Sequence, residues 1–222
     1  MTEIEAKFIV PDEATLQKLL EMRELGRFRL EPGPTKQVGD SYRDTVDRAI
    51  QRGGYACRIR RQDDKQIATL KGLGRAEGAV HQRAEHEVTL DGGSPRLGEA
   101  PADWPASPAR KLALALSQGE PLVELFSLCQ QRYTRTVHAA VSTSEGGRLV
   151  AELSLDVVEM HIGDGVKTSF ELEVELAPDG TPDDLALMVA DLRDKWQLQP
   201  QPRSKFERAL AALTENGAMS YP

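Results

Sequence analysis

This chain of 222 residues contains only two cysteines, Cys57 and Cys129, and no CxxC motif. That scarcity argues against a disulfide framework and against a zinc site. The N-terminus lacks the basic, apolar and small-residue order of a signal peptide. The longest wholly apolar run, Leu112–Leu116, is far too short to span a membrane. We therefore expect a soluble, cytoplasmic protein without a membrane partner.

An excess of basic residues is also lacking, since the formal net charge is −7 and the sequence pI is near 5.3. An acidic chain does not favour broad binding to nucleic acid, because neutralising phosphates needs a basic surface. It remains compatible with a basic pocket inside an acidic shell. Hydrophobic residues make up 40% and charged residues 28%, which is typical of a globular protein with a substantial core.

Many short strands and a few helices are predicted from the spacing of apolar residues and from turn signals. Most strands follow one another closely, which favours antiparallel pairing. The expected strands cover residues 2–10, 40–45, 55–62, 66–72, 81–90, about 128–142, 148–159 and 168–176. Helices are expected at about 12–25, 108–117, 183–196 and 204–214, with Thr181 and Asp183 capping the third. Loops are expected at 31–39, 72–80 and 92–108, and turns at 63–64 and 146–147.

The first strand raises a question about its charged face. Glu3, Glu5 and Lys7 occupy alternate positions, with apolar residues between them, so they share one face of the strand. Two glutamates two residues apart on one face repel each other. We therefore predict that Glu3 and Glu5 repel each other until a divalent cation binds.

The same pattern recurs on later strands, and the charges separate by sign. Glu171, Glu173 and Glu175 share one face, and so do Arg58 and Arg60. Each strand alone is compatible with the solvated face of an ordinary antiparallel sheet. Together they favour a closed sheet whose charged faces turn inward and whose apolar outside is covered by the helices at 12–25, 183–196 and 204–214. Carboxylates for Mg²⁺ or Mn²⁺ and cations for a polyanion are what phosphoryl transfer needs.

Glu3-x-Glu5-x-Lys7 resembles the ExExK signature of the CYTH superfamily, the triphosphate tunnel metalloenzymes. Further motifs of the family follow in order: YRDT (42–45), CRIR (57–60), TLKG (69–72), HQRAEHEV (81–88), QQRY (130–133), LSLD (153–156), FELEVEL (170–176) and RSKFERA (203–209). The stretches GRAEGAVHQRAEHEV and LVELFS resemble most closely the bacterial inorganic triphosphatases. Many of these carry a C-terminal CHAD domain, for which this sequence is too short. We expect one CYTH domain at 1–214 and a tail at 215–222.

The resemblance implies an α+β, mainly β fold: an eight-stranded antiparallel closed barrel with helices packed outside. It also implies metal-dependent hydrolysis of inorganic triphosphate to diphosphate and phosphate, with Mg²⁺ or Mn²⁺ as cofactor. Carried over by position, the metal ligands would be Glu3, Glu5 and Glu175, with Glu173 positioning the attacking water beside them. The basic residues along the substrate path would be Lys7, Arg58, Arg60, Lys71, Arg83, Arg132 and Lys205, of which Lys7 and Lys71 would act in catalysis. Supporting carboxylates, which orient the cations or assist a second metal, would be Glu85, Glu87, Asp156 and Glu171.

Three positions depart from the family pattern. Gln130 stands where many members have a basic residue, which would weaken contact with one phosphate; Arg43 and Val158 would alter the tunnel entrances. Several alternatives stay open. The same fold could act on thiamine triphosphate or nucleoside triphosphates, including ATP cyclisation as in class IV adenylate cyclases, or it could bind polyphosphate without catalysis. The sequence gives no prediction of oligomeric state.

Overall fold

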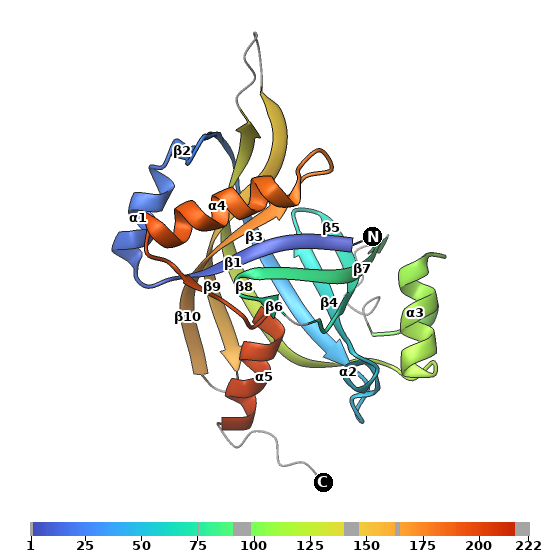
Figure 1. Cartoon of the computed structure of the whole chain (residues 1–222). Coiled ribbons are helices and arrows are strands. Elements are labelled where there is room, and N and C mark those ends of the chain that lie inside the picture. Colours follow the sequence, from blue (N-terminus) through green and yellow to red (C-terminus); the bar gives the residue numbers. More distant parts are fainter. Residues whose placement is uncertain (1, 75, 91–98, 140–146, 163–164, 216–222) are drawn as a thin grey trace.

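The computed structural model describes residues 2–74, 76–90, 99–139, 147–162 and 165–215, and its long strands form one closed ring (Figure 1). The ring strands are β1 (Thr2–Val10), β3 (Phe28–Asp44), β4 (Tyr55–Gln62), β5 (Lys65–Gly72), β7 (Val80–Leu90), β8 (Val123–Ala139), β9 (Arg148–Ile162) and β10 (Gly165–Leu176). They follow one another in the order β1, β10, β9, β8, β3, β4, β5, β7, and antiparallel pairing of β7 with β1 closes the circle. The predicted eight-stranded, mainly β fold is confirmed.

Shorter elements sit at the margins of the ring. Strands β2 (Glu24–Leu25), β6 (Ala76–Glu77) and β11 (Gln199–Pro200) pair with β3, β7 and β1 respectively. The helices are α1 (Glu13–Leu20), α2 (Ala49–Arg52), the 3-10 helix η2 (Pro101–Asp103), α3 (Pro108–Ser117), α4 (Pro182–Asp194) and α5 (Lys205–Glu215). No helix in the described part of the chain is both long and apolar enough to cross a membrane.

Local capping explains where several helices begin. The Asp12 side chain accepts a hydrogen bond from the Thr15 backbone at 2.7 Å, which caps α1 as its position before the helix predicts. Thr181 caps α4 in a reciprocal capping box with Asp184, rather than with the predicted Asp183. In the YRDT motif, Asp44 is buried and accepts hydrogen bonds from the backbones of Ile50 and Gln51, so it caps α2.

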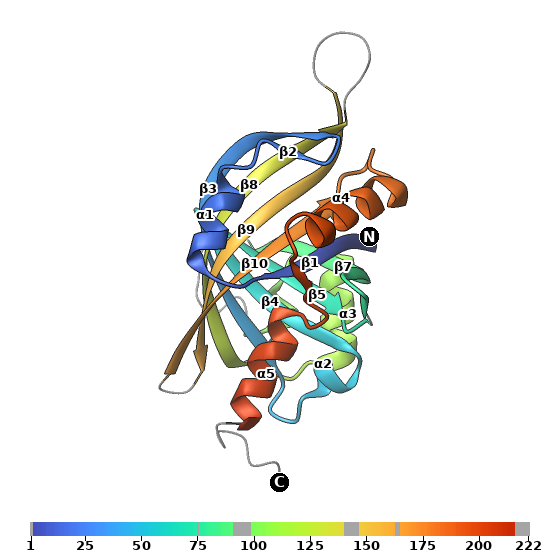
Figure 2. The ribbon, with the colours of Figure 1, turned by 60° about the vertical axis from the view of Figure 1, so that its left-hand side comes forward.

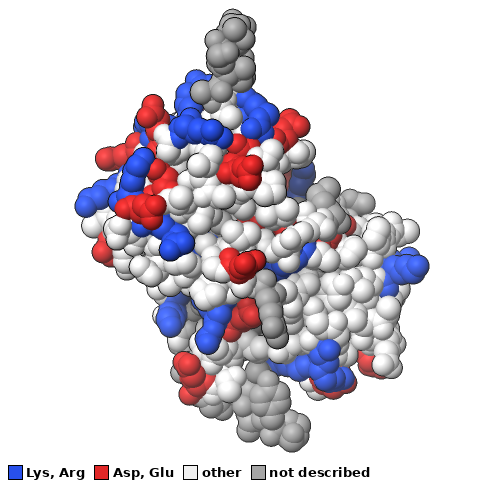
Figure 3. Space-filling model, viewed as in Figure 1, with Lys and Arg blue, Asp and Glu red and all other residues white. Residues whose placement is uncertain are grey.

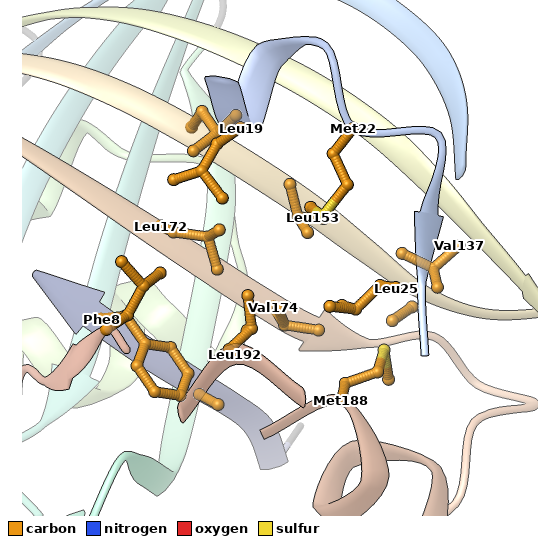
Figure 4. Close-up of a cluster of buried hydrophobic side chains, with 14 of the residues drawn as sticks. Phe8, Leu19, Met22, Leu25, Val137, Leu153, Leu172, Val174, Met188 and Leu192 are labelled. Atoms are coloured by element: carbon orange, nitrogen blue, oxygen red, sulfur yellow. The ribbon is translucent and has the colours of Figure 1, made fainter. Parts of the chain in front are cut away.

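Apolar side chains face outward from the ring and are covered by α1 and α4. Figure 4 shows this cluster, in which Phe8 of β1 and Leu172 of β10 pack near Met188 and Leu192 of α4. A smaller cluster around Leu70 of β5 includes residues of α2 and α3, on another side of the ring (Figure 2). Because side chains alternate along each strand, an apolar outside places the charged side chains inside.

Helix α5 occupies a different place from the one predicted. Its residues Phe206, Ala209 and Leu213 pack with Phe126 and Met160, whose side chains point into the ring. The helix therefore closes one end of the ring interior instead of covering the outside, as its position at the lower end of the ribbon also indicates (Figure 1). The apolar stripe of α5 is real, but its partners are inward-facing residues.

Several predicted boundaries are wrong; for example, the predicted loop at 72–80 contains β6. The predicted loop at 31–39 belongs to β3, where Pro32 and Pro34 lie at an irregularity in the pairing with β8 and before pairing with β4 begins at Val38. Proline is tolerated at such edges and bulges because no ladder hydrogen bond is required of it. The first helix ends at Leu20, and β8 begins at Val123, five residues before the predicted 128. Residues 91–98 and 140–146, which include parts of the predicted loop and turn, lie outside the described residues.

Candidate active site

The interior of the ring contains a cavity of about 270 Å³ lined almost entirely by charged side chains. All the predicted site residues except Asp156 and Glu171 line it: Glu3, Glu5, Lys7, Arg58, Arg60, Lys71, Arg83, Glu85, Glu87, Arg132, Glu173, Glu175 and Lys205. Lys205 reaches it from α5, and the others come from the ring strands. Closure of the sheet thus brings together residues that are more than 150 positions apart in the sequence.

The register of β1 and β10 sets the centre of this cavity. Glu5 lies opposite Glu175, and Lys7 lies opposite Glu173. Lys7 forms ion pairs with Glu173 and, at 3.0 Å, with Glu5. The pKa of Lys7 is raised: burial alone would lower it, but the two glutamates favour its charged form.

Glu173 is the point on which three cations converge. Its carboxylate contacts Lys7, Lys205 at 2.9 Å and Arg132 at 2.7 Å. Burial alone would raise the pKa of Glu173, but Lys205, Lys7 and Arg132 hold it well below its usual value. Glu173 is therefore ionised across the ordinary pH range.

Asp156 and Glu171 are buried inside the ring but do not line the cavity. Asp156 accepts hydrogen bonds from Arg132 at 2.8 and 2.6 Å and from Lys205 at 3.1 Å, and Glu171 pairs with Lys205 and Arg208. Oxygen atoms of Asp156, Glu171 and Glu173 lie within 4.8 Å of one another, so these three carboxylates could hold a cation. In the structure the Lys205 ammonium contacts all three. Asp156 thus holds cationic side chains rather than presenting a free metal ligand.

Glu3 and Glu5 are each neutralised by basic side chains. Lys71 donates to both oxygens of Glu3, at 2.8 and 2.9 Å, and Arg83 donates to Glu5. Burial would raise the pKa of Glu5, but Lys7, with Lys71 and Arg83, lowers it to about 2. The basic side chains thus favour the charged form of Glu5, and the repulsion between Glu3 and Glu5 stays a prediction.

Glu175 is a carboxylate of the cavity without a balancing charge in the described part of the chain. Among the residues that the structure describes, it has no ion-pair partner, although Glu3 and Glu5 lie nearby. Burial raises the pKa of Glu175 to about 7, and Glu3, Glu5 and Glu85 add to the rise. A carboxylate with a raised pKa among other carboxylates marks an excess of negative charge, and hard oxygen ligands suit Mg²⁺ or Mn²⁺. The donor set Glu3, Glu5 and Glu175 therefore fits the predicted metal.

The opposite wall carries the guanidinium groups of β4. Arg60 forms a bidentate pair with Asp40, with both distances 2.8 Å, and Arg58 lies 3.7 Å from Glu87 and 4.0 Å from Asp40. Burial would raise the pKa of Asp40, but Arg60 and Arg58 lower it well below its usual value. Lys71 completes this wall, with its ammonium 3.2 Å from Glu85.

Sequence reasoning missed three charged residues of the site, Asp40, Lys36 and Glu152. Asp40 is buried beneath Arg60, and Gln130 donates a hydrogen bond to it at 2.6 Å, so the unusual glutamine supports an arginine through Asp40. Lys36 and Glu152 line the cavity. Glu152 lies on the same face of its strand as Asp156, so alternation along the sequence could have identified it as a residue of the site. Lys36 lies in the segment predicted as a loop, where strand alternation makes no prediction about side-chain direction.

The other two departures from the family pattern lie away from the cavity. Arg43 donates to Ser41 at 3.1 Å and to the Leu122 carbonyl at 3.4 Å, and it is not among the lining residues. Val158 is fully buried in the cluster that packs against α5. Val158 therefore belongs to the closed end of the ring, where apolar packing holds α5.

Basic side chains gather in the cavity without forming a basic outer surface on the face shown. On the face seen in Figure 3, basic and acidic side chains are interspersed and form no continuous basic surface. In the cavity, the pKa values of Arg58 and Lys205 are raised, although burial alone would lower them. Asp40 favours the charged form of Arg58, and Glu171 favours the charged form of Lys205. A polyanion of small cross-section would thus find its cationic partners in the interior.

Comparison with solved structures shows the same architecture in other proteins. The chain resembles a candidate adenylyl cyclase from Hippeastrum with a dominant triphosphatase activity, at a TM-score of 0.67 and 21% identity, over 95% of this chain and 96% of that one. It also resembles a candidate adenylate cyclase from Bacillus halodurans, at a TM-score of 0.58 and 20% identity, over 93% and 96% of the two chains. A protein from Pyrococcus horikoshii has a TM-score of 0.53 and 19% identity, over 95% and 99%.

These likenesses concern the fold. A direct match to a sequence family is more specific: residues 1–210 match the CYTH domain, and this range includes every strand of the ring and the first half of α5. The closed ring, its charged interior and this match agree, and the chain belongs to the CYTH domain family.

Proposed function

We propose that this protein is a metal-dependent triphosphatase that hydrolyses inorganic triphosphate to diphosphate and phosphate inside the ring. The observation that carries the proposal is the combination of Glu175, an unneutralised carboxylate, with a wall of buried cations in one cavity. A binding module needs the cations, whereas the carboxylates of Glu3, Glu5 and Glu175 add nothing to polyanion binding unless a metal joins them. Both parts together favour an enzyme.

The metal ligands are Glu3, Glu5 and Glu175. When bound there, Mg²⁺ or Mn²⁺ would neutralise charge on the phosphate oxygens and polarise them. Arg58, Arg60, Lys71, Arg83 and Arg132 are the hydrogen-bond donors for the phosphate chain. Charge-assisted bonds of this kind fix both the position and the orientation of an oxyanion.

Glu173, Lys7 and Lys205 form the reactive centre. Since the pKa of Glu173 is held well below its usual value, this residue accepts a hydrogen bond from a water molecule and orients it, rather than acting as a strong base. Lys7 and Lys205 hold Glu173 in place and are themselves within reach of the cavity. Positioning and charge neutralisation supply most of the catalysis in phosphoryl transfer, and this site offers both.

The size and lining of the cavity favour an inorganic substrate. A volume of about 270 Å³ is slightly below the usual range for pockets that bind drug-sized ligands. Tyr42, Phe206 and Leu73 are the large apolar side chains among the lining residues, and charged groups dominate the rest. A bare phosphate chain can form charge-assisted hydrogen bonds along most of such a lining, whereas a nucleoside or thiamine moiety would place uncharged groups against it.

The test is phosphate release from the purified protein with Mg²⁺ or Mn²⁺, on triphosphate, diphosphate, ATP and thiamine triphosphate, with cyclic AMP measured in the ATP reaction. We expect preferred cleavage of triphosphate and loss of activity in excess EDTA, restored by either metal. Substantial turnover in EDTA would contradict the metal-dependent mechanism. A preference for ATP, or production of cyclic AMP, would show that the proposed substrate is wrong while the proposed site residues still apply. Binding of triphosphate without any turnover would favour the alternative that the protein binds polyphosphate without catalysis.

A further inference from the structure

A second, smaller cavity lies beside α5, and we call it the α5 pocket. It has a volume of about 160 Å³, and its polar lining residues are Lys167 and Ser169 of β10, Arg203, and Arg208 and Glu215 of α5. Three basic side chains thus face one acidic side chain. None of these residues lines the catalytic cavity.

The position of the α5 pocket follows from the alternation along β10. Lys167, Ser169, Glu171, Glu173 and Glu175 point to the same side of this strand, into the ring. Glu173 and Glu175 line the catalytic cavity, and Lys167 and Ser169 line the α5 pocket. The buried Glu171 lies between the two groups, so the α5 pocket is at the end of the ring interior that α5 closes.

Several hydrogen-bond donors in this pocket have no partner. Ser169 Oγ and Arg208 Nε are buried and lack a hydrogen-bond partner among the residues that the structure describes. Within the same described residues, Lys167 and Arg203 have no ion pair through their side chains. A buried donor without an acceptor is costly, and a cluster of such donors with positive charge suits a small oxyanion.

We propose that the α5 pocket is a second anion site that binds inorganic phosphate, with Lys167, Ser169, Arg203 and Arg208 as its ligands. The volume is sufficient for one phosphate group. The site is separate from the catalytic cavity, and its existence does not depend on the activity proposed above.

One carboxylate links the two cavities. Glu171 pairs with Arg208 on the side of the α5 pocket and with Lys205 on the side of the catalytic cavity. A phosphate that draws Arg208 away from Glu171 leaves that carboxylate to Lys205 alone. Lys205 is then held more firmly and is less available to an anion in the catalytic cavity. Phosphate in the α5 pocket should therefore weaken the binding of triphosphate, and by linkage the reverse also holds.

The experiment measures binding without turnover, in EDTA. Calorimetric titration with inorganic phosphate should show two sites, one in each cavity. Phosphate in the catalytic cavity competes with tripolyphosphate in every variant. The α5 pocket should add a further loss of tripolyphosphate affinity in the wild type, about fivefold or more, that levels off as phosphate is raised, within the usual range of coupling between sites. The double variant Lys167→Gln/Arg203→Gln should retain one phosphate site. It should not show the additional loss of tripolyphosphate affinity that phosphate in the α5 pocket causes in the wild type. Its tripolyphosphate affinity in the absence of phosphate should stay within about twofold of the wild type.

The matched control is Lys18→Gln/Arg193→Gln, which removes the same charge from exposed positions on α1 and α4 and should behave as the wild type. A single phosphate site in the wild type would overturn the proposal, and so would a second site that survives in the double variant. Equal weakening of tripolyphosphate binding in the wild type and the double variant at every phosphate concentration would show competition in the catalytic cavity alone and would also overturn it. Thermal melts establish that each variant is folded, and because no turnover is required, an inactive protein still tests this site.

Discussion

Glu5 of β1 and Glu175 of β10 lie directly opposite each other in the ring, yet their pKa values move in opposite directions. Lys7 and Arg83 contact Glu5, and its pKa falls to about 2. Glu175 has no such partner among the described residues, and burial beside Glu3 and Glu5 raises its pKa to about 7. Negative charge is thus unbalanced at Glu175, and a divalent cation bound there would neutralise it.

Replacing Glu175 by glutamine should stabilise the metal-free protein in a defined pH window. A carboxyl whose pKa is raised on folding costs nothing below its unfolded value of about 4.5, and the cost grows until the pH passes about 7. Because Glu175 is partly open to solvent, we expect a gain on the order of 1 kcal/mol at pH 8 and none at pH 4. Thermal melts in EDTA at both pH values measure this, and Mg²⁺ should stabilise the variant less than the wild type.

Glu5→Gln is the matched comparison, and its effect should have the opposite sign. The pKa of Glu5 is lowered on folding, so its charge contributes stability above about pH 4.5 that is lost as the pH falls towards 2. Removing that charge takes the carboxylate partner from Arg83 and leaves Lys7 paired with Glu173, which should lower the melting temperature at pH 8. An equal rise in both variants would show that the ion pairs around Glu5 do not hold in solution.

Glu173→Gln should separate catalysis from binding. The glutamine keeps the size of the side chain but removes the charge that orients water, so kcat should fall by about 10²-fold or more. The cations Lys7, Arg132 and Lys205 lose a competing carboxylate, and triphosphate affinity should therefore hold or improve. Arg60→Ala should instead raise KM by about tenfold or more, since a charge-assisted hydrogen bond is removed. Equal losses in KM alone for both variants would make these role assignments wrong.

Asp40 should affect substrate binding through Arg60. Asp40 is buried and does not line the cavity, and it accepts hydrogen bonds from Nε and Nη2 of Arg60, both at 2.8 Å. Asp40→Asn removes one of the two charged acceptors, and we expect KM for triphosphate to rise several-fold with little change in kcat. The informative measurement is the double-mutant cycle with Arg60→Ala. If Asp40→Asn weakens binding equally with and without Arg60, Asp40 does not position that arginine.

Phe206 should hold α5 in the end of the ring. Its ring lies 5.5 Å from Tyr42 and 5.9 Å from Phe126 between centroids, and only 3% of the residue is exposed. Phe206→Ala should cost about 3–5 kcal/mol of the free energy of unfolding, as expected for a large cavity in a packed cluster. Chemical denaturation measures this change, with the milder Phe206→Leu as control. A loss below about 1 kcal/mol would mean that α5 is not seated in the ring in solution.

The sequence by itself determined which face of each ring strand is charged. Alternation is a local property of an extended backbone, so Glu3, Glu5 and Lys7 had to share a side of β1, as did Glu171, Glu173 and Glu175 on β10. Capping is equally local, and Asp12 marked the start of α1 correctly. The resemblance to CYTH motifs added the closed ring. The individual roles of the site residues stay predictions.

The tertiary structure alone decided how these charges are matched. Lys7 meets Glu173 across 166 positions of sequence, and such a pair depends on the register and closure of the ring rather than on local spacing. The same closure placed Asp40 under Arg60 and left Glu175 without an ion-pair partner among the described residues. It also took α5 into the ring interior, because an amphipathic helix has the same pattern whether it covers the outside of a sheet or closes its end. Local periodicity therefore predicts faces, whereas the pairing of charges depends on contacts between segments that are distant in the sequence.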